Sequence, residues 1–224
     1  LDSWESNHGG ITWGGCSSGD LVCLNAKHTV LISGDWSGAD EARVTISGWT
    51  TDPIAEIEIR AVGTARHNGT TAESDDYVLN PGVGIDGHAL TITDDNVMID
   101  GIRITGVTGT SSEGMRLEGD KVIVMNNIIH DLDDGSGTSD GIHINQAAND
   151  SSFRILNNIF FEIERSAAIV QDPNTSGAQV SGIWAEISNN TGYRIGTVAT
   201  STGIPVFGAD SDLSLIHISE PTRL

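Results

Sequence analysis

The chain has 224 residues, with 31 acidic and 11 basic side chains and a net charge of −20 at neutral pH. Binding to nucleic acid depends on Lys and Arg at phosphates, so this charge argues against a nucleic-acid partner and against an anionic membrane surface. No run of about eighteen apolar residues exists, so we expect no membrane insertion.

Residues 1–82 contain short strand-like runs separated by Gly, Asp and Thr, which predict an N-terminal β cap with the first irregular turns of the fold. Cys16 and Cys23 are the only cysteines, and their spacing allows a small disulfide loop, which favours an oxidising compartment. A pair of reduced thiols is the alternative. The predicted strands are Leu21–Leu24, Thr29–Ser33, Arg43–Ser47, Glu56–Val62 and Tyr77–Leu79.

Residues 83–212 contain a repeat in which alternating apolar residues end in Asp-Gly or Asn-Asn. The central apolar residues of its four copies are spaced by 25, 31 and 32 positions. A period in this range, built from short strands, indicates a solenoid. These central residues are Ile99, Val124, Ile155 and Ile187.

Each copy of the repeat predicts three short strands, and the alternation assigns one face of every strand to the interior. The first Asn of each pair is expected to turn the chain and to bond its equivalents in a structural ladder, namely Asn126, Asn157 and Asn189. The inward positions are Val97, Ile99, Ile104, Leu117, Val122, Val124, Ile129, Ile144, Phe153, Ile155, Phe160, Val170, Ala185, Ile187 and Val206.

This pattern resembles the right-handed parallel β-helix proteins, the architecture of pectate lyases and of many surface and phage proteins. The resemblance implies an all-β fold, a right-handed parallel β-helix solenoid with an N-terminal β cap. The fold supports unrelated functions, so the resemblance does not select an activity.

Residues 213–224 look like the in-frame translation of a transposase-type sequencing adapter. We therefore expect this tail to be an artefact on a fragment of a gene from mixed environmental DNA, and we leave it out of the fold.

An acidic segment precedes the third predicted strand of one repeat. Its carboxylates at Asp131, Asp133, Asp134 and Asp140 can surround a hard cation, and calcium is the expected ion because it takes oxygen ligands. A solvated acidic turn is the alternative.

The same segment carries candidate catalytic residues, because carboxylates beside a His can act as acid and base. Thr138–Ile142 looks a little like the Asn-Thr-Asp-Gly motif of β-helix polygalacturonases, which makes Asp140 the candidate acid. The Asp pair of that family is replaced by Ser166–Ala168 in the next repeat. The candidate catalytic set is Asp133, Asp134, Asp140 and His143, and a lyase would also use the outward Arg116, one repeat below His143.

An aromatic column is predicted on the second strand of successive repeats. His130, Phe161 and Tyr193 follow Thr105 at the same outward position and would form an exposed strip suited to sugar rings, together with Arg116 as substrate-binding residues. A loop folded over the strip is the alternative.

These features lead to one expected function and two alternatives. We expect a secreted or cell-surface protein that binds polysaccharide through a lateral face with calcium support. The alternatives are a polysaccharide lyase or glycoside hydrolase acting on an extracellular glycan, and a passive structural fibre of a cell surface or virion.

Overall fold

The structure of the protein is a computed structural model. It describes residues 1, 4, 15–70, 75–82, 87–109, 111–132, 138–145, 151–163, 168–171 and 184–195. Within these ranges no helix is long and apolar enough to cross a membrane.

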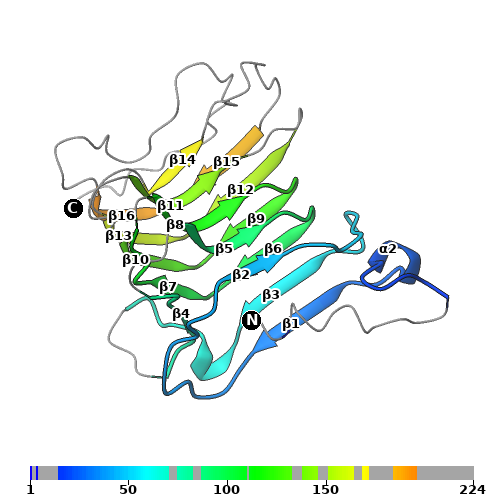
Figure 1. The fold of residues 1–224 in the computed structure, drawn as a ribbon, viewed down its shortest axis with the longest axis horizontal. Coiled ribbons are helices and arrows are strands. Elements are labelled where there is room, and N and C mark those ends of the chain that lie inside the picture. Colours follow the sequence, from blue (N-terminus) through cyan, green and yellow to red (C-terminus); the bar gives the residue numbers. More distant parts are fainter. Residues whose placement is uncertain are drawn as a thin grey trace.

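Three all-parallel sheets make up most of the described chain (Figure 1). The first sheet has the order β1-β3-β6-β9-β12-β15, the second β16-β13-β10-β7-β4 and the third β14-β11-β8-β5-β2. From β3 onward the chain visits the first, second and third sheets in turn, so every third strand returns to the same sheet. This arrangement is compatible with a β-helix-like fold.

The strands are short, as expected for a chain that turns often. The first sheet contains β1 (His28–Ile32), β3 (Ile57–Ala61), β6 (Val97–Asp100), β9 (Val122–Met125), β12 (Ser152–Leu156) and β15 (Trp184–Ser188). The second contains β4 (Val78–Leu79), β7 (Arg103–Thr105), β10 (Ile128–Leu132), β13 (Ile159–Ile163) and β16 (Thr191–Ile195). The third contains β2 (Val44–Ile46), β5 (Gly87–Ile92), β8 (Ser111–Leu117), β11 (Thr138–Ile144) and β14 (Ile169–Gln171).

The predicted register of the first sheet is confirmed. Ile99 pairs with Val124, Val124 with Ile155, and Ile155 with Ile187. These residues are buried in one continuous apolar core, because inward positions of adjacent parallel strands stack directly on each other. The core is the main source of the fold's stability, since it removes apolar surface from water.

The predicted stack of inward residues on the third strands is wrong at Val170, its last member within the described residues. Val170 pairs with His143, whereas Gln171 pairs with the buried Ile144. A register slip of one residue is enough to turn alternate side chains to the other face, and residues 164–167, which precede this strand, lie outside the described part of the chain. Val206 also lies outside it.

The two residues of each Asn pair have different structural roles. Asn126, Asn157 and Asn189 have φ near +55°, the left-handed conformation that Asn tolerates at a turn. The amide ladder, however, is formed by the second Asn of each pair. Asn127 Nδ2 donates to Asn158 Oδ1 at 3.0 Å, and Asn158 Nδ2 donates to Asn190 Oδ1 at 3.0 Å.

The predicted ladder was therefore assigned one position too early. Asn127 and Asn158 are fully buried, and their side chains also bond backbone groups of neighbouring turns. The first Asn of a pair adopts the turn conformation, so the second Asn directs its amide into the stack.

The N-terminal region keeps four of its five predicted strands, as β1 to β4. The fifth, Leu21–Leu24, is the helix α2 (Leu21–Leu24). Asp20 Oδ1 accepts a hydrogen bond from Cys23 N at 2.8 Å, which caps the first turn, and Asn25 ends the helix in the left-handed conformation. A disulfide joins Cys16 to Cys23.

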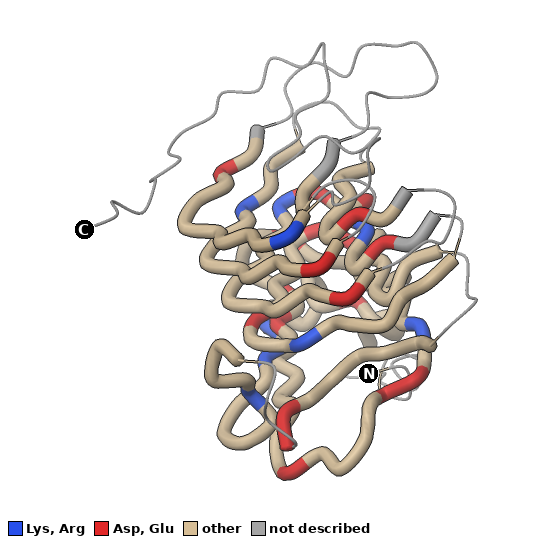
Figure 2. The backbone as a smooth tube through the Cα atoms, turned by 90° about the vertical axis from the view of Figure 1, so that its left-hand side faces the viewer, with Lys and Arg blue, Asp and Glu red and all other residues tan. Residues whose placement is uncertain are grey.

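Acidic and basic residues occur at many positions along the backbone of the described chain (Figure 2). Several form ladders between strands, as where Arg154 Nε donates to Glu186 Oε2 at 2.7 Å. Arg103 and Asp76 form a buried ion pair at 2.8 Å.

Candidate functional site

The alternation of inward and outward residues in the third sheet breaks at Gly114 and Gly141, and this break, which we call the kink, creates the candidate site. In β8 the side chains of Met115 and Leu117 are buried in the core, so strict alternation would also place Glu113 inside. The pairing of β8 with β11 instead passes over Gly114 and Gly141. Glu113 contacts His143, which follows the buried Ile142 and precedes the buried Ile144 and therefore lies on the outer face.

Glycine is required at this kink because another backbone passes close by. A Cβ at Gly141 would lie 2.4 Å from the Ala168 carbonyl oxygen and 2.7 Å from Phe160 Cδ1. Both distances are shorter than real Cβ contacts. The kink therefore depends on two glycines, and it brings residues three positions apart, such as Asp140 and His143, to one face.

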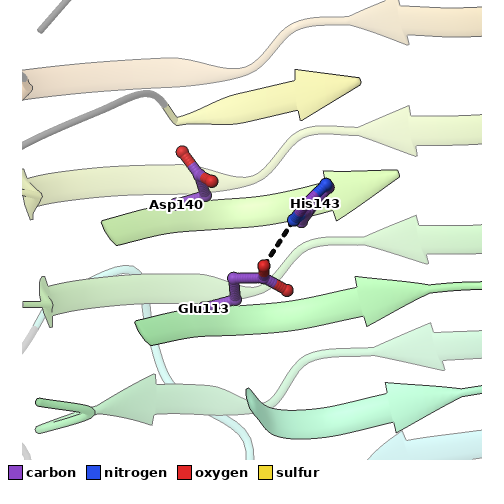
Figure 3. A group of neighbouring side chains, drawn as sticks. All are labelled: Glu113, Asp140 and His143. Carbon is purple, nitrogen blue, oxygen red and sulfur yellow. Dashed lines mark hydrogen bonds and ion pairs between the residues drawn. The ribbon is translucent and has the colours of Figure 1, made fainter. Parts of the chain in front are cut away.

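We call the resulting group the Glu113 cluster. It spans the neighbouring strands β5, β8 and β11, and Figure 3 shows its three central residues, with the side chains of Glu113 and His143 directed at each other. Less than a tenth of each central residue is exposed. The members are His88, Glu113, Arg116, Asp140 and His143.

His88 lies between Arg116 and Glu113. Arg116 Nη1 lies 3.0 Å from His88 Nε2, and because Arg can only donate, His88 Nε2 is the acceptor in this contact. The other ring nitrogen, Nδ1, lies 2.7 Å from Glu113 Oε2.

Glu113 is the charged centre of the cluster. Its Oε1 accepts from His143 Nδ1 in a short contact. Burial alone would raise the pKa of Glu113, but hydrogen bonds and charge interactions with His143 and His88 lower the pKa to about 2. Glu113 is therefore ionised at neutral pH, and it holds the imidazole of His143 in a defined orientation.

The cluster also brings metal-ligating atoms together. One ligand atom each from Glu113, Asp140 and His143 lies within 4.8 Å of the others, and all three residues are buried. Asp131 is not in this group. It lies on β10 in the second sheet, where its half-exposed carboxylate contacts His130 Nδ1 at 2.7 Å.

The structure brings together some of the predicted site residues. Asp140 and His143 share one face of β11, and Arg116 pairs with His143 as the register predicted. Asp133 and Asp134, predicted for both the catalytic and the calcium site, lie outside the described residues.

Glu113 and His88 were not predicted. A signal for Glu113 exists in the sequence, because Ser112-Glu-Gly-Met-Arg116 matches Ser139-Asp-Gly-Ile-His143 in residue character. Each segment reads Ser, acid, Gly, apolar, base. Extending the third-strand alignment by three residues toward the N-terminus would have found the match.

The predicted aromatic column lies in register on the second sheet. His130 pairs with Thr105 and Phe161, and Phe161 pairs with Tyr193. The rings of His130 and Phe161 stack with centroids 4.5 Å apart. Tyr193 is 66% exposed.

The expected exposure is wrong for His130, which is only 6% exposed. Its ring lies between Thr105, Phe161 and Asp131, and these contacts enclose it. Burial lowers the pKa of His130, against the opposing effect of the Asp131 carboxylate. The accessible part of the column is therefore the half-buried Phe161 and the exposed Tyr193.

A shallow pocket of about 290 Å³ lies near the N-terminal end, away from all predicted site residues. Both carboxylate oxygens of Asp94 accept backbone hydrogen bonds there, from Gly48 and Trp49. Asp94 thus stabilises a turn. The pocket is lined by Trp49, Thr50, Thr51, Thr93, Asp94 and Asp95.

Comparison with known proteins does not add a relative to this description: no family model, no curated protein and no solved structure matches the chain.

Proposed function

We propose that the chain is a right-handed parallel β-helix that binds an extracellular polysaccharide along its lateral face. The cyclic visit to three parallel sheets supports the helix, and parallel crossovers are nearly always right-handed. The disulfide between Cys16 and Cys23 supports a secreted or cell-surface location, because such bonds persist in oxidising compartments.

The observation that carries this proposal is the aromatic column of the second sheet. The ring of His130 stacks on one face of the Phe161 ring, with the two ring planes 13° apart. Tyr193, at the next position of the column, presents an exposed ring with a polar hydroxyl. Aromatic rings with an apolar face and a polar edge suit ligands, such as sugars, that have both characters.

Binding can be tested by retention on insoluble polysaccharides and by affinity electrophoresis. We expect Phe161→Ala and Tyr193→Ala each to weaken binding about fivefold, and the double variant to combine the two losses, because each ring contributes roughly 1 kcal/mol. Leu31→Ala is the control, since Leu31 is 58% exposed on the first sheet. Wild-type retention by the double variant, across glycans that the wild type binds, would contradict the proposal.

A second candidate function, polysaccharide cleavage, is favoured by the contact between Glu113 and His143. An ionised carboxylate that accepts from Nδ1 leaves Nε2 of His143 with a lone pair, which suits a general base. The same face carries Asp140 as a candidate acid. A lyase would use the base to remove the proton beside a uronate carboxylate, and a hydrolase would use the acid to protonate the leaving oxygen.

Cleavage is tested by product release. A lyase forms products with an absorbing double bond, whereas a hydrolase forms only new reducing ends. We expect His143→Gln and Asp140→Asn to abolish release while the melting temperature stays close to that of the wild type. If product release falls only in proportion to the amount of folded protein, the cluster has a structural role and no catalytic one.

A further inference from the structure

The Glu113 cluster has the composition of a metal site. Glu113 and Asp140 offer carboxylate oxygens, His143 offers an imidazole nitrogen, and these atoms lie within 4.8 Å of one another. Donors bound at 2.0–2.2 Å to a tetrahedral ion are about 3.4 Å apart, so small side-chain rotations complete the geometry. All three side chains are buried, which shields them from competing water.

The strands hold the donors in place. Asp140 pairs with Glu113 across β8 and β11, so their separation follows the fixed spacing of parallel strands. His143 reaches the same point from two residues beyond Gly141, where the Ala168 carbonyl leaves no room for a larger residue. The three donors therefore come from rigid strands and not from a mobile loop.

The donor types select the class of metal. Calcium and magnesium prefer sites made of oxygen atoms alone, whereas imidazole with carboxylate suits zinc, manganese, iron and cobalt. His88 adds a second imidazole, since its Nδ1 lies 2.7 Å from Glu113 Oε2. Because its Nε2 accepts from Arg116, His88 is expected to orient Glu113 from outside the site, as groups that hydrogen-bond to metal ligands commonly do.

We propose that Glu113, Asp140 and His143 form a binding site for a divalent transition metal such as zinc. Coordination through His143 Nδ1, the nitrogen that faces Glu113, requires the proton that Nδ1 donates to Glu113 to move to Nε2, so a neutral His143 binds the ion with no net loss of a proton. Two carboxylates balance the charge of the ion. Three protein ligands leave a further position for water or substrate, as in catalytic zinc sites. The site does not depend on polysaccharide binding, because that proposal rests on the second sheet.

The test uses the full chain, freed of metal with a chelator and dialysed. Zinc binding is measured by calorimetry and by elemental analysis in excess calcium, which occupies sites made only of carboxylates. We expect one tightly bound zinc per chain. Cobalt substitution should give visible absorption bands of a four- or five-coordinate ion, and zinc should raise the melting temperature by mass action.

Three variants, Glu113→Gln, Asp140→Asn and His143→Gln, examine the ligands one at a time. Each is expected to weaken zinc binding about a hundredfold or more, because even outer-shell changes cost roughly 10–100-fold. His88→Gln should cost about tenfold if it supports the site from outside. Glu186→Gln, in the ion-pair ladder of the first sheet, is the control and should bind zinc like the wild type.

Two results would overturn the proposal. One is a folded wild-type protein that binds no stoichiometric zinc, and the other is wild-type affinity in all three ligand variants. If a variant does not fold, NMR of the histidine ring nitrogens in the wild-type protein takes the place of that variant. Zinc bound at the proposed site must shift the ring-nitrogen signals of His143. Glycan retention by Phe161→Ala and Tyr193→Ala is measured without zinc. The glycan-binding proposal and the zinc-site proposal can therefore fail independently of each other.

Discussion

Glu113 and His143 are on adjacent strands but are not opposite each other. The pairing places Glu113 beside Asp140 and Arg116 beside His143, so the contact between Glu113 Oε1 and His143 Nδ1 runs diagonally across the kink. This diagonal contact joins the buried carboxylate of Glu113 to the imidazole of His143.

Glu113 should make stability depend on acid pH. Its pKa falls from 4.5 in a free chain to about 2 in the fold, so its contribution is present above about 4.5 and is lost as the pH falls toward 2. The shift corresponds to on the order of 3 kcal/mol. We expect the difference in unfolding free energy between wild type and Glu113→Gln to shrink over this range.

Denaturant unfolding at a series of pH values measures this difference. Other carboxylates titrate in both proteins, so the subtraction isolates Glu113. A difference that stays constant from pH 4.5 down to 2 would show that the His143 and His88 contacts do not stabilise the charged form.

Asn158→Ala should be strongly destabilising. Asn158 Oδ1 accepts from Asn127 N at 2.9 Å, and its Nδ2 donates to the Val124 carbonyl at 3.0 Å, all away from water. Leaving these groups unpaired is expected to cost about 2–4 kcal/mol. Thermal and urea unfolding measure the loss.

Asn157→Gly is the matched control for that variant. Asn157 is exposed with φ +57°, a conformation that glycine adopts freely, so we expect a change within about 0.5 kcal/mol. Equal losses in both variants would mean that the turn, and not the buried ladder, carries the stability.

Gly141→Ala should disturb both the fold and the cluster. The added Cβ would overlap the Ala168 carbonyl and Phe160, which is expected to cost about 1–3 kcal/mol or more and to displace Asp140 and His143. Unfolding free energy and zinc affinity should fall together. Gly38→Ala is the control, because a Cβ there meets nothing within 4 Å; similar behaviour of the two variants would refute the close approach.

Ile155→Ala should open a cavity in the central apolar stack. Ile155 is fully buried between Val124 and Ile187, so the expected loss is about 2–5 kcal/mol. Ile54→Ala, at a position 72% exposed, should change stability by no more than about 0.5 kcal/mol. Differential scanning calorimetry compares the two, and a small loss at Ile155 would contradict its place in the core.

The first sheet was the most predictable part of the fold. Val124 and Ile155 belong to long alternating runs that end in an Asn pair, and both pairing and burial follow from that local pattern. The position of Val170 is not fixed by alternation alone, because a register slip of one residue changes which residue faces inward. The strand prediction for Leu21–Leu24 is wrong because four apolar residues fit either structure, and the cap at Asp20 favours the helix.

The candidate site was only partly predictable. Asp140, His143 and Arg116 were identified from their own strands, since outward positions follow from alternation. Glu113 was missed because alternation places it inside. Alternation fails there at Gly114 and Gly141, where close contacts with neighbouring strands leave no room for a side chain.

The amino-acid sequence alone thus predicts the parallel, repeating arrangement and its apolar stacks. The reason is that alternation and repeat spacing can be read from each segment of the chain by itself. The face on which Glu113 lies, the member of each Asn pair that forms the ladder, and the burial of His130 are set in three dimensions. Each depends on a contact with a strand 25 or more residues away, as between His130 and Thr105 or between Asn127 and Asn158. Such contacts exist only once neighbouring strands are stacked, and they decide which polar side chains converge.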